Sequence, residues 1–397
     1  MSQDMSAIVE ILVNEKFVDE QVIDSQMMDQ AMGLAIATAS RSRRLSPPNP
    51  WVGAVVLSAS GEVVGSGSTQ APGGSHAEVA ALLEAGELAR DGVLVVTLEP
   101  CNHQGRTPAC TEQIIAAGIS RVVVAIQDPD PLVSGSGIER LRSAGLQVSL
   151  GTRAAEVCDQ LAPYLHQRLT GRAFCVVKTA MSLDARSVAR DGTSQWITGP
   201  EARADAHNLR ADSQAVVIGA GTALADSPSL NARDATPPAT RQPNRVLLDA
   251  RGRVPATGPL FDQSIAATIV FTTDSADSEA LKAWRAAGAG VEIVEPQGSG
   301  VHLKQVLQVL SEKYGVLQAM VEGGAAMHAA FIEASLVDRV VAYVAPTFLG
   351  RDGRLAFDLD GPSTVMDASK WRITNTMLVG SDIRITLEPI VAAEELS

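Results

Sequence analysis

Apolar and polar positions along the first 150 residues alternate in a way that predicts a mixed α/β arrangement. From Met27 to about Ser42 apolar and small residues dominate, which is typical of a helix packed on a core, and the proline-rich segment 46–50 ends it. The segment VGAVVLSASGEVVGSG predicts two strands joined by a turn at Ser60 and Gly61. Further along, the pattern predicts a helix from Ala77, a strand Val93–Leu98, a helix from about Thr111, a strand Arg121–Ala125, and a helix and strand that end near Leu150.

A second series of apolar segments begins after residues 151–171, which we interpret as a linker. AFCVVKTAM predicts a strand, and VEGGAAMHAAF predicts a strand, a glycine turn and a helix. Gly323 and Gly324 would let backbone N–H groups approach an anion at the start of that helix, as a dinucleotide phosphate requires, although a pair of glycines there can also be only a turn. No GxGxxG motif follows the first strand, so an ordinary dinucleotide-binding Rossmann domain is not supported.

Length and composition narrow the classes of protein that fit. A chain of 397 residues predicts two domains, and we place an N-terminal extension at 1–26 and domains at 27–170 and 171–397. The formal net charge of -13 disfavours a nucleic-acid partner, because such binding requires a basic surface. No apolar stretch is long enough for a membrane span, and the acidic start is unlike a signal peptide, so we expect no membrane association and a cytoplasmic location.

One group of residues in the first domain predicts zinc chemistry. His76, Cys101 and Cys110 are three metal-ligand types, and Glu78 follows the histidine by two positions. A catalytic zinc site uses three protein ligands and leaves its fourth position to a water whose pKa it lowers. Glu78 is placed to take the proton from that water and pass it to a departing amine, as in zinc nucleobase deaminases. A structural zinc site is the alternative, although such sites normally close with a fourth Cys or His.

The spacing of the two cysteines is unusual for a deaminase. Two residues commonly separate them, whereas eight, NHQGRTPA, lie between Cys101 and Cys110. Four cysteines in so long a chain do not form a disulfide framework. We expect the other two, Cys158 and Cys175, to be buried apolar residues rather than reactive thiols.

The motifs PNPWVGAVV, GGSHAEVAAL, TLEPCNHQGRTPAC and AIQDPDP closely resemble the N-terminal half of the bacterial bifunctional riboflavin-biosynthesis family, diaminohydroxyphosphoribosylaminopyrimidine deaminase/5-amino-6-(5-phosphoribosylamino)uracil reductase. The resemblance continues through HNLRADSQAVVIGAGTALADSPSLNAR and VEGGAAMHAAFI and covers nearly the whole chain after the extension. It implies a cytidine-deaminase-like α/β/α sandwich followed by a dihydrofolate-reductase-like α/β domain, with Zn²⁺ and NADPH as cofactors.

In the first domain the resemblance implies that Asn49 lines the pyrimidine pocket, although an Asn beside prolines can also be only a turn residue. His103 and Arg106, in the long cysteine loop, would contact the base or the ribose phosphate, or would stabilise the loop alone. The substrate implied is a small phosphoribosylated pyrimidine, 2,5-diamino-6-(5-phosphoribosylamino)pyrimidin-4-one. Family members commonly self-associate, so we expect a homo-oligomer.

In the second domain Arg210 and Arg233 are candidates to bind the substrate phosphate, because a guanidinium matches phosphate oxygens with two hydrogen bonds. Lys178 and Glu322 lie at strand positions, where an unpaired charge would be costly, and we hypothesise that they polarise the ribosyl carbon and manage its proton while NADPH delivers hydride. The resemblance adds substrate contacts from Ser194, Leu230 and Glu322, and NADPH contacts from Met181, Trp196, Thr222, Asp226, Gly323 and Gly324. Trp196 is otherwise interpreted as a core aromatic residue.

Three positions of the second domain depart from the family pattern, namely Ala185 in place of Gly, Ser227 in place of Asp, and Arg351 in place of Gly. Glycine often serves a turn with positive φ, which alanine adopts at a cost of about 1 kcal/mol. The alternatives are therefore a deaminase whose C-terminal domain binds a ligand without reducing it, a nucleic-acid-editing protein, and a non-catalytic zinc protein.

Overall fold

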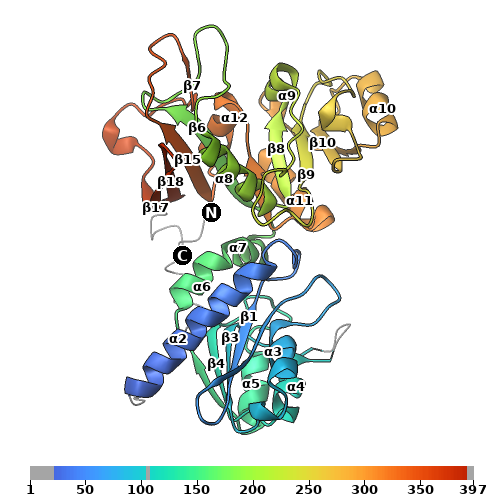
Figure 1. Cartoon of the computed structure of the whole chain (residues 1–397). Helices are drawn as coiled ribbons and strands as arrows, with labels where there is room; N and C mark the ends of the chain where they lie inside the picture. Colours follow the sequence, from blue (N-terminus) through green and yellow to red (C-terminus); the bar gives the residue numbers. More distant parts are fainter. Residues whose placement is uncertain (1–21, 104–107, 391–397) are drawn as a thin grey trace. The chain divides into compact units, whose positions relative to one another are not determined.

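The computed structural model describes residues 22–103 and 108–390, which form two compact units (Figure 1). The boundary between the units falls between Thr170 and Gly171. Each unit is built around its own β-sheet. None of the helices in these ranges is long and apolar enough to cross a membrane.

The first unit contains a five-stranded sheet with the strand order β2-β1-β3-β4-β5. Its strands are β1 (Gly53–Leu57), β2 (Val63–Ser68), β3 (Val93–Leu98), β4 (Arg121–Ile126) and β5 (Gln147–Leu150). β1 pairs antiparallel with β2 and β3, whereas β3, β4 and β5 are parallel. β1 and β4 are almost completely buried, as expected for apolar strands covered on both faces. The predicted hairpin is confirmed, and its turn contains Gly61 with φ 84°.

Helices cover both faces of this sheet (Figure 1). They are α2 (Val22–Ala39), the 3-10 turn η1 (Ser40–Ser42), α3 (Ala77–Ala85), η2 (Gly86–Ala89), α4 (Cys110–Ala116), α5 (Ser136–Ser143), α6 (Ala154–Gln160) and α7 (Ala162–Thr170). Glycines let the helices approach closely. A Cβ added at Gly53 would lie 1.9 Å from the Ala35 carbonyl oxygen of α2, and one added at Gly67 would lie 2.3 Å from the Ala77 carbonyl oxygen of α3. The neighbouring strands thus present their glycines to opposite faces.

Three predictions for this unit differ from the structure. The first helix begins at Val22 rather than Met27, because no helix-breaking residue separates those positions, and residues 22–26 of the predicted extension belong to it. Residues 151–171 are not a simple linker, since α6 and α7 occupy most of that segment and bury Cys158 and Tyr164. Cys101 does not end a strand, because β3 ends three residues earlier.

The second unit contains a nine-stranded sheet with the order β11-β10-β9-β8-β14-β6-β15-β18-β17. Its strands are β6 (Phe174–Ser182), β8 (Ala215–Gly219), β9 (Asn244–Leu248), β10 (Thr268–Thr272), β11 (Gly290–Ile293), β14 (Gln318–Val321), β15 (Arg339–Ala345), β17 (Trp371–Val379) and β18 (Asp382–Pro389). The strands from β11 to β15 are parallel, and β18 and β17 add antiparallel at one edge. Two small ribbons pair β12 (Pro296–Gln297) with β13 (Gly300–Val301) and β7 (Arg186–Val188) with β16 (Arg354–Leu355).

Helices on both faces of the large sheet form two apolar cores. The helices are α8 (Pro200–Ala211), α9 (Ala220–Asp226), α10 (Ser278–Ala286), α11 (Leu303–Tyr314) and α12 (Ala325–Glu333), with 3-10 turns η3 (Pro259–Phe261) and η4 (Val365–Asp367). One core combines Leu307 of α11 and Phe331 of α12 with Val217 of β8, and the other combines Ala223 of α9 and Trp284 of α10 with the adjacent strand residues. The predicted strand around Cys175 is confirmed, and its thiol is buried.

Candidate active sites

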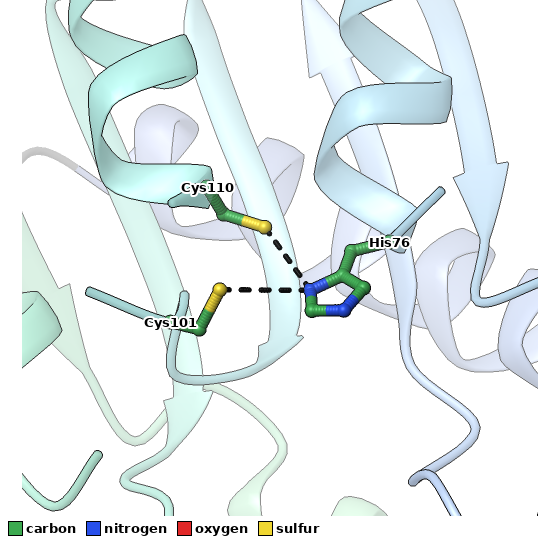
Figure 2. Close-up of side chains that lie close together, drawn as sticks. All are labelled: His76, Cys101 and Cys110. Carbon is green, nitrogen blue, oxygen red and sulfur yellow. Dashed lines mark hydrogen bonds between the residues drawn. The ribbon is translucent and has the colours of Figure 1, made fainter. Parts of the chain in front are cut away.

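The three predicted metal ligands converge in the first unit (Figure 2). His76 is the N-cap of α3, Cys110 is the first residue of α4, and Cys101 lies in the loop after β3. The Nδ1 atom of His76 lies 3.2 Å from the Cys110 Sγ and 3.6 Å from the Cys101 Sγ. Among the described residues, the potential ligand atoms of these three lie within 4.8 Å of one another.

These distances fit a zinc ion. Tetrahedral zinc with bonds of about 2.0 Å to nitrogen and about 2.3 Å to sulfur separates the nitrogen from each sulfur by about 3.5 Å. The two observed separations, 3.2 and 3.6 Å, bracket that value. One nitrogen and two sulfurs also leave a fourth position for a water, which distinguishes a catalytic site from a closed structural one.

Glu78 lies in the first turn of α3 and is buried, with 4% of its surface exposed. Burial raises the pKa of its carboxyl group, and the neighbouring His76 opposes that effect. A carboxyl group whose pKa is raised toward neutrality can both accept and donate a proton, which is the property that acid/base catalysis requires.

The two cysteines differ in their ionisation. A hydrogen bond from Cys110 and another from His76 lower the pKa of the Cys101 thiol to about 4, whereas the pKa of Cys110 is raised, mainly by its hydrogen bond to Cys101. The hydrogen bond to Cys101 also raises the pKa of His76. Cys101 is thus a thiolate before any cation is bound, which is the form that coordinates metal.

The other residues predicted for this site lie in two loops. Asn49 is half-buried in a turn closed by a hydrogen bond from its own N–H to the Ser46 carbonyl oxygen. His103 is exposed, at the start of the long cysteine loop. Arg106 lies outside the described residues.

Sequence reasoning missed Glu99, whose carboxylate accepts hydrogen bonds from the backbone N–H groups of Asp128, Gly135, Gly137 and Ile138. It is 4% exposed and lies two residues before Cys101. The signal available in the sequence is a glutamate placed directly after a buried strand, where a charge requires partners.

In the second unit, Lys178, Arg210 and Glu322 form a charged cluster where β6, α8 and the end of β14 meet. Arg210 donates two hydrogen bonds of 2.6 Å to the Glu322 carboxylate, and its third donor binds the Asn231 carbonyl oxygen at 3.0 Å. Burial raises the pKa of Glu322, but Arg210 and then Lys178 lower it more, to about 2. Burial lowers the pKa of Lys178, and Glu322 opposes this shift. The cluster therefore holds an ionised carboxylate beside a lysine from which a proton leaves more easily than usual.

The pairing of Arg210 bears on its predicted role in phosphate binding, because most of its donors are engaged by protein oxygens. Arg233 is more available, with about half of its side chain exposed and an ion pair of 3.2 Å to Asp234. Leu230 is 3% exposed and packs in an apolar core, with φ 53°.

His207 is a second residue that sequence reasoning missed. It lies three residues before Arg210 on α8, so both side chains project from one face of the helix. Its Nδ1 lies 3.1 Å from the same Asn231 carbonyl oxygen, and its Nε2 lies 3.4 Å from Asp234. Two side chains of α8 thus hold the loop that carries Arg233.

The predicted NADPH residues lie mainly at the starts of α9 and α12. Gly323 and Gly324 join β14 to α12, as the sequence predicted, and Gly324 is the helix N-cap. A Cβ on Gly324 would lie 3.9 Å from the Thr222 hydroxyl of α9, so the two helix starts are neighbours. A Cβ on Gly323 would lie 2.6 Å from Met327, so only glycine fits there. Asp226 is exposed at the end of α9.

The remaining predicted contacts occupy β6 and the segment before α8. Met181 is half-buried in β6, and Ser194 is half-buried in the segment that follows β7. Trp196 is 64% exposed, so the alternative of a core aromatic residue is wrong. The guanidinium of Arg203 lies 4.5 Å from the centre of its ring, and this contact fixes an indole that does not pack in the core.

Two of the three departures from the family pattern occur at residues with positive φ, 59° for Ala185 and 41° for Ser227. The expectation that position 185 requires such a conformation is confirmed. Arg351 follows Gly350, whose φ is 80°. The N–H groups of Leu349 and Gly350 both bind the Asp184 carboxylate, so positions 185 and 351 flank the two sides of one turn contact.

Comparison with known families assigns both units. Residues 25–126 match the cytidine and deoxycytidylate deaminase zinc-binding region, and residues 173–385, more than half of the chain, match the RibD C-terminal domain. The first match spans all three candidate metal ligands and Glu78, and the second spans the charged cluster and both glycines of the α12 turn. The predicted α/β fold class, with a deaminase-like domain before a reductase-like one, is confirmed by these matches and by the solved structures that follow.

Individual proteins are similar over nearly the whole chain. The riboflavin biosynthesis protein RibD of Chlamydia trachomatis is 41% identical over 359 residues, which are 90% of this chain and 94% of that protein. The structure of Acinetobacter baumannii RibD superposes with a TM-score of 0.83 at 35% identity, covering 92% of this chain and all of that one. The Thermotoga maritima diaminohydroxyphosphoribosylaminopyrimidine deaminase/5-amino-6-(5-phosphoribosylamino)uracil reductase superposes with a TM-score of 0.81 at 30% identity, covering 92% of this chain and all of that one.

Proposed function

This chain belongs to the RibD family of riboflavin-biosynthesis enzymes, and we propose that its two units act in turn on one phosphoribosylated pyrimidine. It is an enzyme with a deaminase domain and a reductase domain. We assign residues 27–170 to the deaminase and 171–397 to the reductase. The alternative of an inactive C-terminal domain is not favoured, because that half matches the RibD C-terminal domain and its charged cluster is intact.

The observation that carries the deaminase proposal is the convergence of His76, Cys101 and Cys110 beside the buried carboxyl group of Glu78. A zinc ion held by the three ligands would supply a Lewis acid that lowers the pKa of a bound water. Glu78 takes the proton from the nucleophile and delivers it to the leaving amine of 2,5-diamino-6-(5-phosphoribosylamino)pyrimidin-4-one, so that ammonia departs. Asn49, His103 and Arg106 border the pyrimidine and its ribose phosphate.

For the reductase we propose that NADPH lies across the starts of α9 and α12. Gly323 and Gly324 offer backbone N–H groups to a phosphate, and Thr222 adds a hydroxyl beside them. The exposed face of Trp196 and the half-buried Met181 border the cofactor, and Asp226 caps the far end of α9.

Lys178 and Glu322 then manage the proton of the reduction. Hydride from NADPH adds to the ribosyl carbon in its open aldehyde or imine form, and Lys178 donates a proton to the oxygen or nitrogen that receives the electron pair, which leaves NADP⁺ and a ribityl chain. Glu322 is held ionised by Arg210 and balances the lysine charge. Arg233 is the free guanidinium for the phosphate, with Ser194 and Leu230 beside the sugar.

Selective loss of the two activities tests this assignment. In Glu78→Gln we expect ammonia release to fall at least about a hundredfold, because the acid/base group is removed, while NADPH oxidation with the deaminated intermediate is retained. Lys178→Met is expected to show the reverse. Glu87→Gln changes an exposed glutamate shortly after α3 and serves as the control. Unchanged ammonia release in Glu78→Gln would remove the proposed deaminase mechanism.

We also propose a homo-oligomer and a cytoplasmic location. The edge strand β17 exposes Ile373, Met377 and Leu378 to 60%, 44% and 75%, and an exposed apolar edge is a typical contact for a second copy of the same sheet. The cytoplasm is favoured because a reducing compartment keeps the thiols of Cys101 and Cys110 available for metal.

A further inference from the structure

The carboxylate of Glu99 is an anchor that the catalytic scheme does not use. Its Oε2 atom accepts hydrogen bonds from the N–H groups of Asp128 at 3.2 Å and Gly135 at 2.9 Å, and its Oε1 atom accepts from Gly137 at 2.9 Å and Ile138 at 3.2 Å. Only 4% of the residue is exposed. Charge-assisted hydrogen bonds of this kind are about twice as strong as neutral ones, and their loss from a buried position is costly.

All four donors come from the segment that connects β4 to the start of α5. This segment also contacts the peptide that leads to the metal ligand. A Cβ added at Gly137 would lie 2.0 Å from the Pro100 carbonyl oxygen, so the segment packs directly on the residue between Glu99 and Cys101. The ring of Pro100 fixes its own φ, so little rotational freedom remains between the anchor and the thiol.

The chain beyond the thiol is held as well. The Thr111 N–H donates to the Cys101 carbonyl oxygen at 3.2 Å, and the Thr111 hydroxyl donates to the Asn102 side chain at 3.0 Å. These contacts tie the Cys101 peptide to the start of α4, next to Cys110. The Cys101 Sγ is therefore clamped from both sides, by Glu99 before it and by Thr111 after it.

We propose that Glu99 is a positioning residue that fixes Cys101 for zinc binding, an inference that rests on the zinc site of the proposed function. It touches neither substrate nor metal. Its four hydrogen bonds hold the Pro100–Cys101 peptide in the one place from which the Cys101 Sγ meets the His76 Nδ1 and the Cys110 Sγ. Residues that orient metal ligands typically change metal affinity by about 10- to 100-fold when they are mutated.

Zinc release and cobalt spectroscopy test this role in the full-length enzyme. In Glu99→Gln we expect zinc to pass to a chromogenic chelator at least about tenfold faster, because an amide NH₂ replaces one acceptor and faces two N–H donors. The cobalt-substituted variant is expected to show a weaker thiolate-to-metal charge-transfer band. The matched control is Glu84→Gln, whose exposed carboxylate accepts the Ser66 N–H at 2.8 Å on the same unit. NADPH oxidation by the reductase is expected to stay unchanged in both variants.

A purely structural role would lower the unfolding temperature of Glu99→Gln without altering the cobalt spectrum of the folded fraction, and that result would overturn the proposal. If Glu99→Gln does not fold, Glu99→Asp takes its place, since it keeps the charge but is one methylene shorter. Zinc release equal to that of Glu84→Gln in this variant would equally overturn the proposal. Failure of the unmodified enzyme to bind zinc would instead refute the proposed function.

Discussion

Asp128 illustrates how single buried groups in this protein take their properties from their partners. Its carboxylate is 5% exposed and accepts the Asp130 N–H at 2.9 Å and the Tyr164 hydroxyl at 3.0 and 3.1 Å. Despite these bonds, burial raises the pKa of Asp128 to about 6. Glu322 shows the opposite balance, because the ion pair with Arg210 outweighs its burial. A buried carboxyl group is ionised here only when a cation faces it.

Asp128 predicts a pH dependence of stability. Its pKa in the unfolded chain is about 3.9, below the folded value of about 6, so the folded state binds the proton more tightly. The stabilisation is complete below about pH 4 and is lost as the pH rises through about 6. In Asp128→Asn we expect the unfolding free energy of the deaminase unit to fall by about 3 kcal/mol less over this range.

Calorimetry measures this difference, with the deaminase transition identified as the one that a zinc chelator shifts. Asp29→Asn, on the exposed side of α2, is the control and is expected to keep the pH dependence of the parent. An Asp128→Asn variant with the same slope as the parent would contradict the role given to Asp128.

At the level of elements, the deaminase site depends on how closely α3 approaches β2. Gly65 and Gly67 of β2 face the backbone of α3, where added Cβ atoms would each lie 2.3 Å from a helix carbonyl oxygen. The start of that helix carries His76 and Glu78. The position of two catalytic-site residues is therefore set by the absence of side chains on a neighbouring strand.

Gly67→Ala tests this packing. Because α3 must move to admit the methyl group, we expect a loss of about 1–3 kcal/mol in the stability of the deaminase unit. Ammonia release is expected to fall while NADPH oxidation is retained, and the two are followed separately in the same sample. Gly361→Ala adds a methyl group where no atom lies within 4 Å and should change neither activity. Equal ammonia release from both variants would show that the close approach does not matter.

At the scale of the whole molecule, the two compact units have separate cores and separate candidate sites. The apolar edge at β17 belongs to the reductase unit alone. This organisation explains how one site can be inactivated without the other, and it assigns self-association to a surface distant in sequence from the zinc ligands.

Leu378→Lys tests the proposed association through β17. A charged side chain at this 75% exposed position should oppose the pairing of two sheet edges. We expect light scattering to report a mass that falls to that of one chain, or a dissociation constant raised at least about tenfold. Leu88→Lys, at a position 63% exposed in the other unit, is expected to keep the parent mass. A parent enzyme that is monomeric at micromolar concentration would refute the proposal.

The sequence by itself determined the chemistry of the first site and most of its scaffold. His76, Glu78, Cys101 and Cys110 are residue types with few other uses in such a spacing, and the strands around them are marked by apolar runs and turn glycines. Local patterns of this kind survive folding because they depend on near neighbours. The same reasoning anticipated the positive φ at Ala185.

Tertiary structure alone decided which distant groups became partners. Arg210 and Glu322 are 112 residues apart, and their pairing engages donors that the sequence offered to a phosphate. Glu99 finds its four donors 29 to 39 residues away. The helices within 151–171 were missed because their short amphipathic segments gain stability only from packing. Pairing and packing energies arise from contacts that a linear pattern does not encode, so they are fixed only when the chain folds.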